Sequence, residues 1–445
     1  MKLRHALALR PGDVISFIGA GGKTSALARL ARELAAEGAR VLVTTTTRMA
    51  ADERGLFQHK SRIDPSPDAP PSPFAERGRE GEILFLYDRI ENDKVIGIAL
   101  EQLPDVIAAH RPDYTLIEAD GSRRKPLKYP KAHEPVISPE TTLIVNVVGY
   151  GALGQPLDEA HIYNADALAQ VCMVKPGIEV SADTIAAAAG VMTQPGVRQV
   201  ALLNAVPPAG SARTIAQRIA RLTLERTPTL ERVLIGAVQT DDPIYTIERR
   251  CAALVLAAGL SSRMGRSKPL LPWGERTVLE QVIGQLRAGL VTDIHVVTGA
   301  EHEAVAVVAA GAGVAVVHNP NYAAGEMLSS LHAGLRALPD HVSAALVTLG
   351  DQPMIRASNV RKLLRTYAEN KGGIVAPSCN MKRGHPILID RQYWDELLVL
   401  SPGSAPRDVI NRHTDDIAYV ETDDSVLQDI DTPEAYAAAL QRFGL

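Results

Sequence analysis

The stretch AALVLAAGLSSRMGRSK (252–268) decides the fold of the second half of this chain. Its first part, AALVLAAG (252–259), is continuously apolar, which is typical of a strand covered on both faces of a parallel sheet. The loop that follows is rich in glycine, serine and basic residues. A strand that leads into such a loop favours a phosphate site, with a solvated, charged turn as the alternative.

Within this loop we expect backbone and side chains to act together. Gly259 and Gly265 allow backbone conformations with positive φ and the close approach of a ligand. Arg263 and Lys268 supply the positive charge that a triphosphate requires. The other residues expected to surround the nucleotide are Ala257, Ala258, Ser261 and Ser262.

Strand-like and helix-like segments alternate on both sides of this loop, along the whole chain. The polar segment VQTDDPIYTIERR (238–250) precedes the apolar strand and predicts a domain boundary. We therefore expect two α/β domains, 1–245 and 250–445, each with a doubly wound sheet.

Composition narrows the class of protein. The net charge of −4 argues against a nucleic-acid partner, and the three scattered cysteines suit a reducing compartment. The start of the chain shows no signal peptide, and its apolar runs are too short to cross a membrane. These features predict a soluble cytoplasmic protein without a membrane partner.

Two acidic motifs follow in the second half. AALVTLGDQP (344–353) predicts a buried strand ending at Asp351, at the sheet edge where ligands bind and where a carboxylate suits Mg²⁺. An ordinary turn aspartate is the alternative. DIDTPE (429–434) predicts a helix start with Thr432 as N-cap, which still allows Asp431 to face a metal.

The order of these motifs resembles the MobA-like nucleotidyltransferase family, and within it the MocA-like molybdenum cofactor cytidylyltransferases. The resemblance rests on LAAGLSSRMGRSK, NPNYAAGEMLSSLHAGL (319–335), LGDQP (349–353), RGHPILI (383–389) and DIDTPEAY. It implies a Rossmann-like domain that transfers CMP from CTP to molybdopterin and releases pyrophosphate. Guanylyltransferase relatives usually read LAGG where this chain reads LAAG, which favours CTP over GTP.

The same resemblance implies roles for single residues. Arg263, Lys268 and Asp351 are expected to be catalytic, and Asp351 and Asp431 to hold Mg²⁺. Asp429 remains the alternative to Asp431, because sequence does not separate the two.

Two more residues are expected on the substrate side of this site. His385 is expected to contact the pterin, with a structural role as the alternative. Arg407 lies in SPGSAPRD (401–408), which lacks the Gly-Asp that relatives carry there, so the substrate is less firmly implied than the nucleotide chemistry. Another transferase, acting on a guanylyl or sugar-phosphate substrate, is the alternative within the enzymes.

The first half opens with a second glycine-rich loop, GAGGKTS (19–25), between a predicted strand and helix. The strict P-loop pattern fails at Phe17, and Thr24 stands where a dinucleotide fingerprint needs its third glycine. A shortened P-loop remains our prediction, with a glycine turn as the alternative. Its expected phosphate residues are Gly19, Gly21, Gly22, Lys23 and Thr24. Glu118 and Asp120, at the end of a later strand, would complete the site.

This loop, TTTTRM (44–49), IEADGSRRKPLKYPKAHEPVI (117–137) and GYGALGQPLDEAHIYNAD (149–166) resemble the YqeC-like family. The family is described as accessory to selenium-dependent molybdenum hydroxylases. The GAGGKTS loop predicts that this domain binds ATP or GTP, and the resemblance implies a xanthine dehydrogenase-type hydroxylase apoprotein, or its chaperone, as partner. The alternative is a nucleotide-gated binding module that docks the hydroxylase without turnover. The expected fold is thus a P-loop-like domain followed by a nucleotidyltransferase domain.

Overall fold

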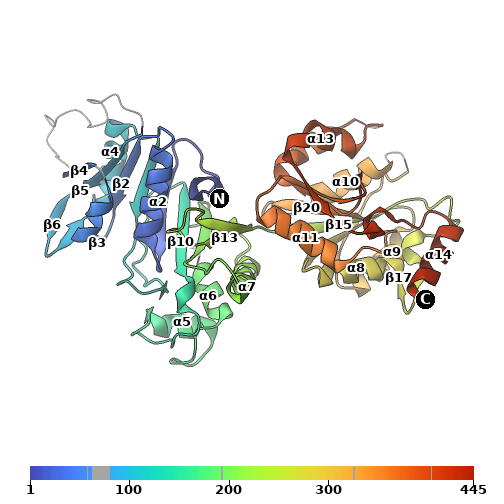
Figure 1. Ribbon diagram of the computed structural model, residues 1–445, viewed down its shortest axis with the longest axis horizontal. Coiled ribbons are helices and arrows are strands. Elements are labelled where there is room, and N and C mark those ends of the chain that lie inside the picture. Colours follow the sequence, from blue (N-terminus) through green and yellow to red (C-terminus); the bar gives the residue numbers. More distant parts are fainter. Residues whose placement is uncertain (58, 63–80, 192–193, 324–325, 402) are drawn as a thin grey trace. The chain divides into compact units, whose positions relative to one another are not determined.

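The computed structural model describes residues 1–57, 59–62, 81–191, 194–323, 326–401 and 403–445. They form two compact units, Met1–Glu248 and Arg249–Leu445, which are treated separately below. Each unit is a largely parallel sheet with helices on both faces, as expected from the alternation of apolar strands with helical segments (Figure 1).

The sheet of the first unit has nine strands. Its order is β14 (Ile244–Glu248), β13 (Arg232–Gly236), β12 (Arg198–Asn204), β10 (Leu143–Gly149), β1 (Val14–Gly19), β8 (Tyr114–Glu118), β2 (Val41–Thr45), β5 (Ile83–Tyr87) and β4 (His59–Arg62). Neighbouring strands are parallel, except that β14 runs antiparallel to β13. Phe17 of β1 pairs with Val145 of β10 and with Glu118 of β8, which brings the end of β8 beside the end of β1.

Helices cover both faces of this sheet. They are α1 (Leu3–Ala6), α2 (Lys23–Ala35), α4 (Leu103–His110), α5 (Ala165–Cys172), α6 (Ala182–Ala189) and α7 (Ser211–Arg226). Leu27 of α2 packs with Phe17 in one buried cluster, and Ile219 of α7 packs with Leu203 in another. Two small sheets complete the unit: β3 (Arg48–Ala50), β7 (Lys94–Ile96) and β6 (Arg89–Glu91), and β9 (Leu127–Lys128) with β11 (Ile162–Tyr163).

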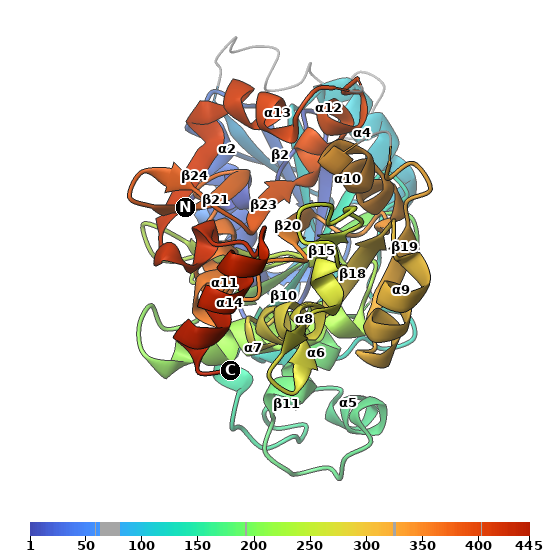
Figure 2. The ribbon, with the colours of Figure 1, turned by 90° about the vertical axis from the view of Figure 1, so that its right-hand side faces the viewer.

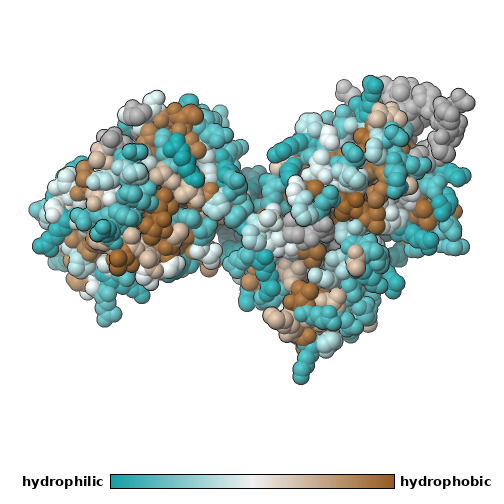
Figure 3. Space-filling view, turned by 180° about the vertical axis from the view of Figure 1, so that it is seen from behind, coloured by the Kyte–Doolittle hydropathy of each residue, from teal (hydrophilic) through white to brown (hydrophobic). Residues whose placement is uncertain are grey.

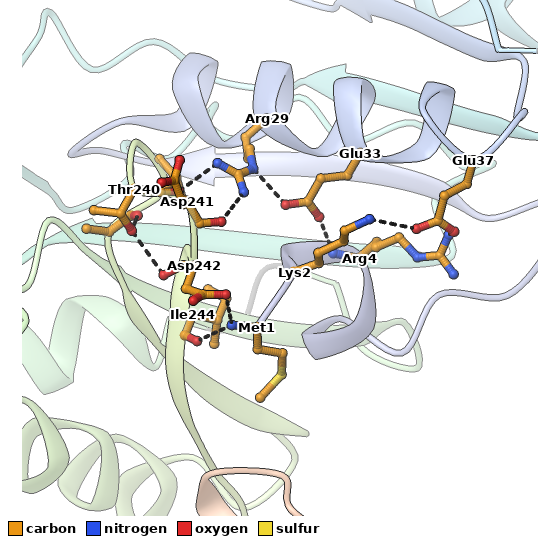
Figure 4. A network of polar contacts seen from close by, with 12 residues as sticks. Met1, Lys2, Arg4, Arg29, Glu33, Glu37, Thr240, Asp241, Asp242 and Ile244 are labelled. Atoms are coloured by element: carbon orange, nitrogen blue, oxygen red, sulfur yellow. Dashed lines mark hydrogen bonds and ion pairs between the residues drawn. The ribbon is translucent and has the colours of Figure 1, made fainter.

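A polar network joins the two ends of the first unit (Figure 4). Arg29 of α2 donates to Glu33 and to the carbonyls of Thr240 and Asp241, each at 2.7 Å. Glu33 in turn accepts a hydrogen bond of 2.9 Å from the amide of Arg4 in α1. The buried carboxylate of Glu33 is thereby paired, and segments far apart in sequence close around α2.

The sheet of the second unit also has a parallel core. Its order is β19 (Ala315–His318), β18 (Asp293–Thr298), β15 (Cys251–Ala257), β20 (Ala344–Leu349), β23 (Ile387–Asp390) and β21 (Ile374–Cys379), with β22 (Lys382–Arg383) and β24 (Ile417–Glu421) both paired to β21 (Figure 2). β23 is antiparallel to both of its neighbours. The connection 380–386 is too short for a crossover, so the chain returns beside β21 as part of an antiparallel turn.

Helices flank this sheet on both faces as well. α8 (Val278–Ala288), α9 (His302–Gly311) and α11 (Ala357–Ala368) share one buried cluster, while α10 (Glu326–Ala337), α12 (Trp394–Leu398) and α13 (Pro406–Arg412) share the other. α14 (Pro433–Phe443) packs on the hairpin β16 (Pro272–Trp273) and β17 (Arg276–Thr277), where Ala439 and Trp273 lie in one cluster. The predicted cap is confirmed, because Thr432 Oγ1 accepts a 3.2 Å hydrogen bond from the amide of Ala435.

The first strand of each unit has parallel neighbours on both sides: β8 and β10 beside β1, and β18 and β20 beside β15. In open α/β sheets, such a strand is where connections leave toward opposite faces and where ligands bind at the carboxyl edge. Both glycine-rich loops lie there.

No helix in the described part of the chain is long and apolar enough to cross a membrane. The face in Figure 3 is mostly hydrophilic, with apolar residues in separate areas.

Candidate functional site

A cavity of about 330 Å³ opens at the carboxyl edge of β15 in the second unit. Six residues expected from the sequence line it: Ala257, Ala258, Gly259, Ser261, Lys268 and Asp351. They come from the loop after β15 and from the end of β20, which are neighbouring strands. Parallel pairing is therefore what brings residues about ninety positions apart to one cavity.

The loop after β15 folds back on itself. The hydroxyl of Ser261 accepts a 3.1 Å hydrogen bond from the amide of Lys268, and Met264 is buried beneath the loop. Gly265 has a φ of +67°, a conformation that glycine allows. Gly259 does not use this freedom, and Ser261, at +50°, is another residue of the loop in the left-handed conformation. A Cβ at Gly259 would meet nothing within 4 Å, so this position faces open space.

Lys268 lies between two carboxylates. Its Nζ is 2.9 Å from Asp351 Oδ2 and 2.5 Å from Asp431 Oδ1, and only 13% of its side chain is exposed. Partial burial lowers the pKa of Lys268, but the hydrogen bonds that it donates to Asp431 and Asp351 outweigh burial and raise it. The lysine is therefore held as a cation at the edge of the cavity.

Arg263 approaches the same cluster from outside. Its guanidinium donates to Asp431 Oδ2 at 2.9 Å, while 76% of the side chain is exposed. The hydrogen bond from Lys268 lowers the pKa of Asp431, and Arg263 adds to the effect. An exposed arginine on a single contact is free to turn toward an incoming anion.

A third carboxylate, Asp429, lies near the other two. Burial raises the pKa of Asp429, and the negative charges of Asp431 and Asp351 raise it further. Within the described ranges no three acidic, histidine or cysteine side chains are arranged as a ready metal site. The oxygen donors nonetheless suit a hard divalent cation, provided that Lys268 leaves the space between Asp351 and Asp431.

The remaining predicted residues lie apart from the cavity lining. Ser262 and Gly265 are exposed. His385 is largely buried, and burial lowers its pKa to about 4, partly offset by Asp351. Its amide donates to the carbonyl of Val426 at 2.9 Å. Arg407 is exposed in the first turn of α13, and none of the described contacts links it to Lys268.

Sequence reasoning missed several residues that line the cavity: Leu256, Leu260, Pro269, Tyr322, Ala323, Met327, Ser330 and Leu349. Ser330 is oriented by the buried Asn319, whose Nδ2 donates to its hydroxyl at 3.1 Å. The signal was present, because the segment 319–335 belongs to the ordered motifs. Nothing in the sequence separated its cavity-facing residues from its packing residues.

The loop GAGGKTS in the first unit is tightly packed. Gly19, Gly21 and Gly22 have φ values of +90°, +82° and +114°. A Cβ at Gly21 would lie 2.3 Å from the amide nitrogen of Gly149, and one at Gly22 would lie 2.5 Å from Asn204 Nδ2. The glycines are therefore required by close approach of neighbouring backbone as well as by φ.

Three amides of this loop are used inside the protein. Gly19 N donates to Asp120 Oδ2 (2.9 Å), Ala20 N to the carbonyl of Val147 (2.8 Å) and Gly21 N to that of Lys125 (3.1 Å). These three amides of the expected phosphate loop are therefore already bonded within the protein and are not available to a phosphate. A phosphate bound in this region would have to contact the first turn of α2, where helix amides have no partner within the helix.

Lys23 is buried rather than presented to solvent. Its Nζ donates to the carbonyl of Gly19 at 2.6 Å and lies 3.1 Å from Asp120 Oδ1, an ion pair without hydrogen-bond alignment. Asp120 also pairs with Lys128 at 3.1 Å. Thr24 donates to Glu118 at 2.8 Å, and burial raises the pKa of Glu118 to about 7 despite the opposing charge of Lys23.

The two units match two families of proteins. The model of the MobA-like NTP transferase domain matches residues 253–417, and the model of the YqeC protein family matches residues 15–166. The fold and the site of the second unit thus define a MobA-like nucleotidyltransferase domain. The chain itself joins a YqeC domain at its N-terminal side to this MobA-like domain at its C-terminal side.

Named relatives divide along the same line. Over 165 residues, 37% of this chain, it is 34% identical to the uncharacterized protein YqeC of Escherichia coli (strain K12), and it spans 62% of that protein's length. Over 194 residues, 43% of this chain, it is 29% identical to the molybdenum cofactor cytidylyltransferase of the same strain, covering 95% of it.

A further relative carries a different activity in its name. The nicotine blue oxidoreductase of Paenarthrobacter nicotinovorans is 30% identical over 205 residues, which is 44% of this chain and 96% of that protein. Among solved structures, Rv0371c from Mycobacterium tuberculosis H37Rv is 25% identical with a TM-score of 0.39, over 43% of this chain and 98% of that one. Relatives of the second unit therefore carry different activities in their names, a cytidylyltransferase and an oxidoreductase.

Proposed function

We propose that the second unit transfers CMP from CTP to the terminal phosphate of molybdopterin and releases pyrophosphate. The observation that carries the proposal is Lys268 held between Asp351 and Asp431 at the edge of a cavity lined by the loop 256–261. The molybdenum cofactor cytidylyltransferase relative supports the choice of substrates, as does Ala258 in LAAG.

In the proposed reaction an oxygen of the substrate phosphate forms a bond to the α-phosphorus of CTP. The bond from that phosphorus to the bridging oxygen of the β-phosphate breaks, and pyrophosphate leaves with the electron pair. Lys268 and Arg263 stabilise the charge that develops on the phosphoryl oxygens, since catalysis of this kind rests on positioning and electrostatics. Asp351 and Asp431 would hold Mg²⁺, whose chemistry is to neutralise triphosphate oxygens.

This proposal gives Lys268 two positions. Without nucleotide it neutralises the two carboxylates, whose mutual repulsion would otherwise be uncompensated. With CTP bound, a divalent ion held by Asp351 and Asp431 would take over that role, and Lys268 would then turn toward the phosphates. Beside the two carboxylates the raised pKa of Lys268 keeps it charged at neutral pH, and in the second position the ordinary pKa of a lysine is enough to do so.

The test incubates the purified chain with molybdopterin, Mg²⁺ and each of the four nucleoside triphosphates while pyrophosphate is measured. Release with CTP, at least tenfold faster than with GTP, is expected. Equal use of all four, or none, would refute the cytidylyl assignment. Preference for GTP would support the guanylyl alternative. Oxidation or reduction of added nicotine blue without pyrophosphate release would support a reaction like that named for the Paenarthrobacter relative.

For the first unit we propose nucleotide binding at the start of α2, with ATP or GTP as ligand and Thr24, Glu118 and Asp120 around a Mg²⁺. The partner would be a xanthine dehydrogenase-type hydroxylase or its chaperone, and one chain would keep both maturation steps at high effective concentration. The pairing of Lys23 with Asp120 specifically favours a binding module over a hydrolase, because that lysine is not free for a phosphate. Measurable hydrolysis that Lys23→Ala abolishes would overturn the binding-module version.

A further inference from the structure

A cluster of cations surrounds a single aromatic ring in the first unit, outside the GAGGKTS loop. Lys128 Nζ lies 4.7 Å from the centroid of the Tyr163 ring, Lys131 Nζ 5.4 Å and the guanidinium carbon of Arg123 5.7 Å. All three cations come from the segment 122–131, and the ring comes from β11. Cation–π attraction holds the charges in place but does not neutralise them.

The charges of this cluster are unevenly balanced. Lys128 is 3% exposed and pairs with two carboxylates, Asp120 at 3.1 Å and Glu134 at 2.9 Å. Lys131 and Arg123 are exposed, and among the described side chains no carboxylate pairs with either of them. Glu134, which pairs with Lys128, also accepts hydrogen bonds from Tyr163 Oη at 3.2 Å and from the amide of Lys131 at 3.3 Å. Among the described residues, the Arg123 and Lys131 side chains therefore converge on one ring and face solvent without an ion pair of their own.

The segment that carries these cations is fixed by the fold. Gly21 N donates to the carbonyl of Lys125 and Gly149 N to that of Pro126, while β9 pairs with β11 so that Tyr163 lies opposite Lys128. Arg123 has a φ of +50°, and Arg124 follows at +58°. Consecutive left-handed arginines are costly for side chains with a Cβ, and such strain concentrates where function requires it.

We propose that Arg123 and Lys131, on the ring of Tyr163, form a binding site for a phosphate group of a small molecule. A guanidinium offers a planar pair of donors and an ammonium offers a compact charge, a combination suited to a tetrahedral oxyanion of charge −2. The net charge of −4 and the short length of the segment favour a small ligand over a nucleic acid. The proposal does not depend on nucleotide binding at α2 or on the transferase reaction.

The experiment measures the acylation rate of single lysines in the full chain by mass spectrometry, with and without inorganic pyrophosphate. Pyrophosphate is expected to slow labelling of Lys131 at least fivefold and to leave Lys94, an exposed lysine of the same unit, unchanged. Orthophosphate and ADP are the parallel arms, and the most protective of the three identifies the ligand class. The acylation rate of Lys268, measured in the same samples, reports on the site of the second unit. A negative result at one site can therefore be distinguished from a negative result at the other.

Two substitutions complete the test. Arg123→Asn removes the charge and keeps a residue that tolerates positive φ, so the pyrophosphate needed for half-protection of Lys131 should rise at least tenfold. Arg111→Asn is the matched control, an exposed arginine with a φ of +45° at the end of α4, and should change it less than twofold. No protection by any phosphate, equal protection by sodium chloride of the same ionic strength, or undiminished protection in Arg123→Asn would overturn the site.

Discussion

Lys268 Nζ lies 2.9 Å from Asp351 Oδ2, although the two residues are 83 positions apart. The loop after β15 carries the lysine and the end of β20 leads to the aspartate, so the parallel pairing of these two strands sets the distance. Asp431, which follows β24, completes the arrangement from a third part of the chain. Five predictions follow from this arrangement, the cavity beside it and the packing of the first unit.

Removal of either cation at this site should slow nucleotidyl transfer. Lys268→Ala and Arg263→Ala are each expected to lower kcat at least a hundredfold, because a preorganised charge on the transition state is lost. Arg266→Ala is the matched control, an exposed arginine of the same loop, and should stay within threefold. The rate of pyrophosphate release with CTP and molybdopterin is measured for all three variants. Equal effects of Arg263→Ala and Arg266→Ala would show that Arg263 has no special role in the proposed site.

The three carboxylates should differ in their effect on the requirement for Mg²⁺. Asp351→Asn and Asp431→Asn are expected to raise the Mg²⁺ concentration for half-maximal rate at least tenfold, since each would remove a ligand. Asp429→Asn should raise it less than threefold, because the ion pairs of Lys268 among the described residues are with Asp351 and Asp431 and not with this carboxylate. Magnesium titrations of the transfer rate test the order, and a larger effect at Asp429 would make it the second ligand.

The cavity should discriminate between bases through a small residue. Ala258 lines the cavity, and Ala258→Gly widens it by one methyl group. The ratio of kcat/KM for CTP to that for GTP is expected to fall about tenfold, the usual scale for one methyl or methylene group in a pocket. The rate with CTP should change less than the ratio does. An unchanged ratio would show that Ala258 does not contribute to the preference for CTP over GTP.

The free energy of unfolding of the first unit should depend on pH because of the buried Glu118. Burial raises its pKa from 4.5 to about 7, so the folded unit keeps a proton that the unfolded chain releases between these values. Stability should therefore fall as pH rises through this window and level off above it, by up to about 3 kcal/mol. Calorimetry of Glu118→Gln should show a flatter profile between pH 5 and 8, and the exposed Glu140→Gln should resemble the parent. Parallel profiles for all three proteins would contradict the shift.

Two glycines with the same φ allow strain and crowding to be separated. Gly21 has a φ of +82° and Gly177 of +84°, but a Cβ would touch backbone only at Gly21. Gly177→Ala should cost about 1–2 kcal/mol, the strain of a left-handed alanine. Gly21→Ala should cost several kcal/mol more or prevent folding, because the loop must move away from Gly149. Denaturation midpoints measure both, and equal losses would show that the loop yields freely.

Much of the fold was predictable because local signals agreed. Continuous apolar strands ending in glycine predicted parallel sheets, and β15, β20 and the start of α14 lie within a few residues of the expected positions. The antiparallel β23 and β14 were not foreseen, since strand direction depends on connections that periodicity does not encode. The sequence also did not indicate that Ser261 takes a positive φ. This residue lies in a turn that is held by a hydrogen bond from the Lys268 amide to the Ser261 hydroxyl.

The sequence by itself determined which residue types could do chemistry here, because glycine, lysine and aspartate at strand ends have few other uses in that order. Only the tertiary structure decided which of them meet. It placed Lys268 between Asp351 and Asp431, turned Lys23 inward onto Asp120, and gathered Arg123 and Lys131 on Tyr163. The physical reason is that pairing of distant strands and burial of charge are long-range events, whereas a motif records only its own neighbours.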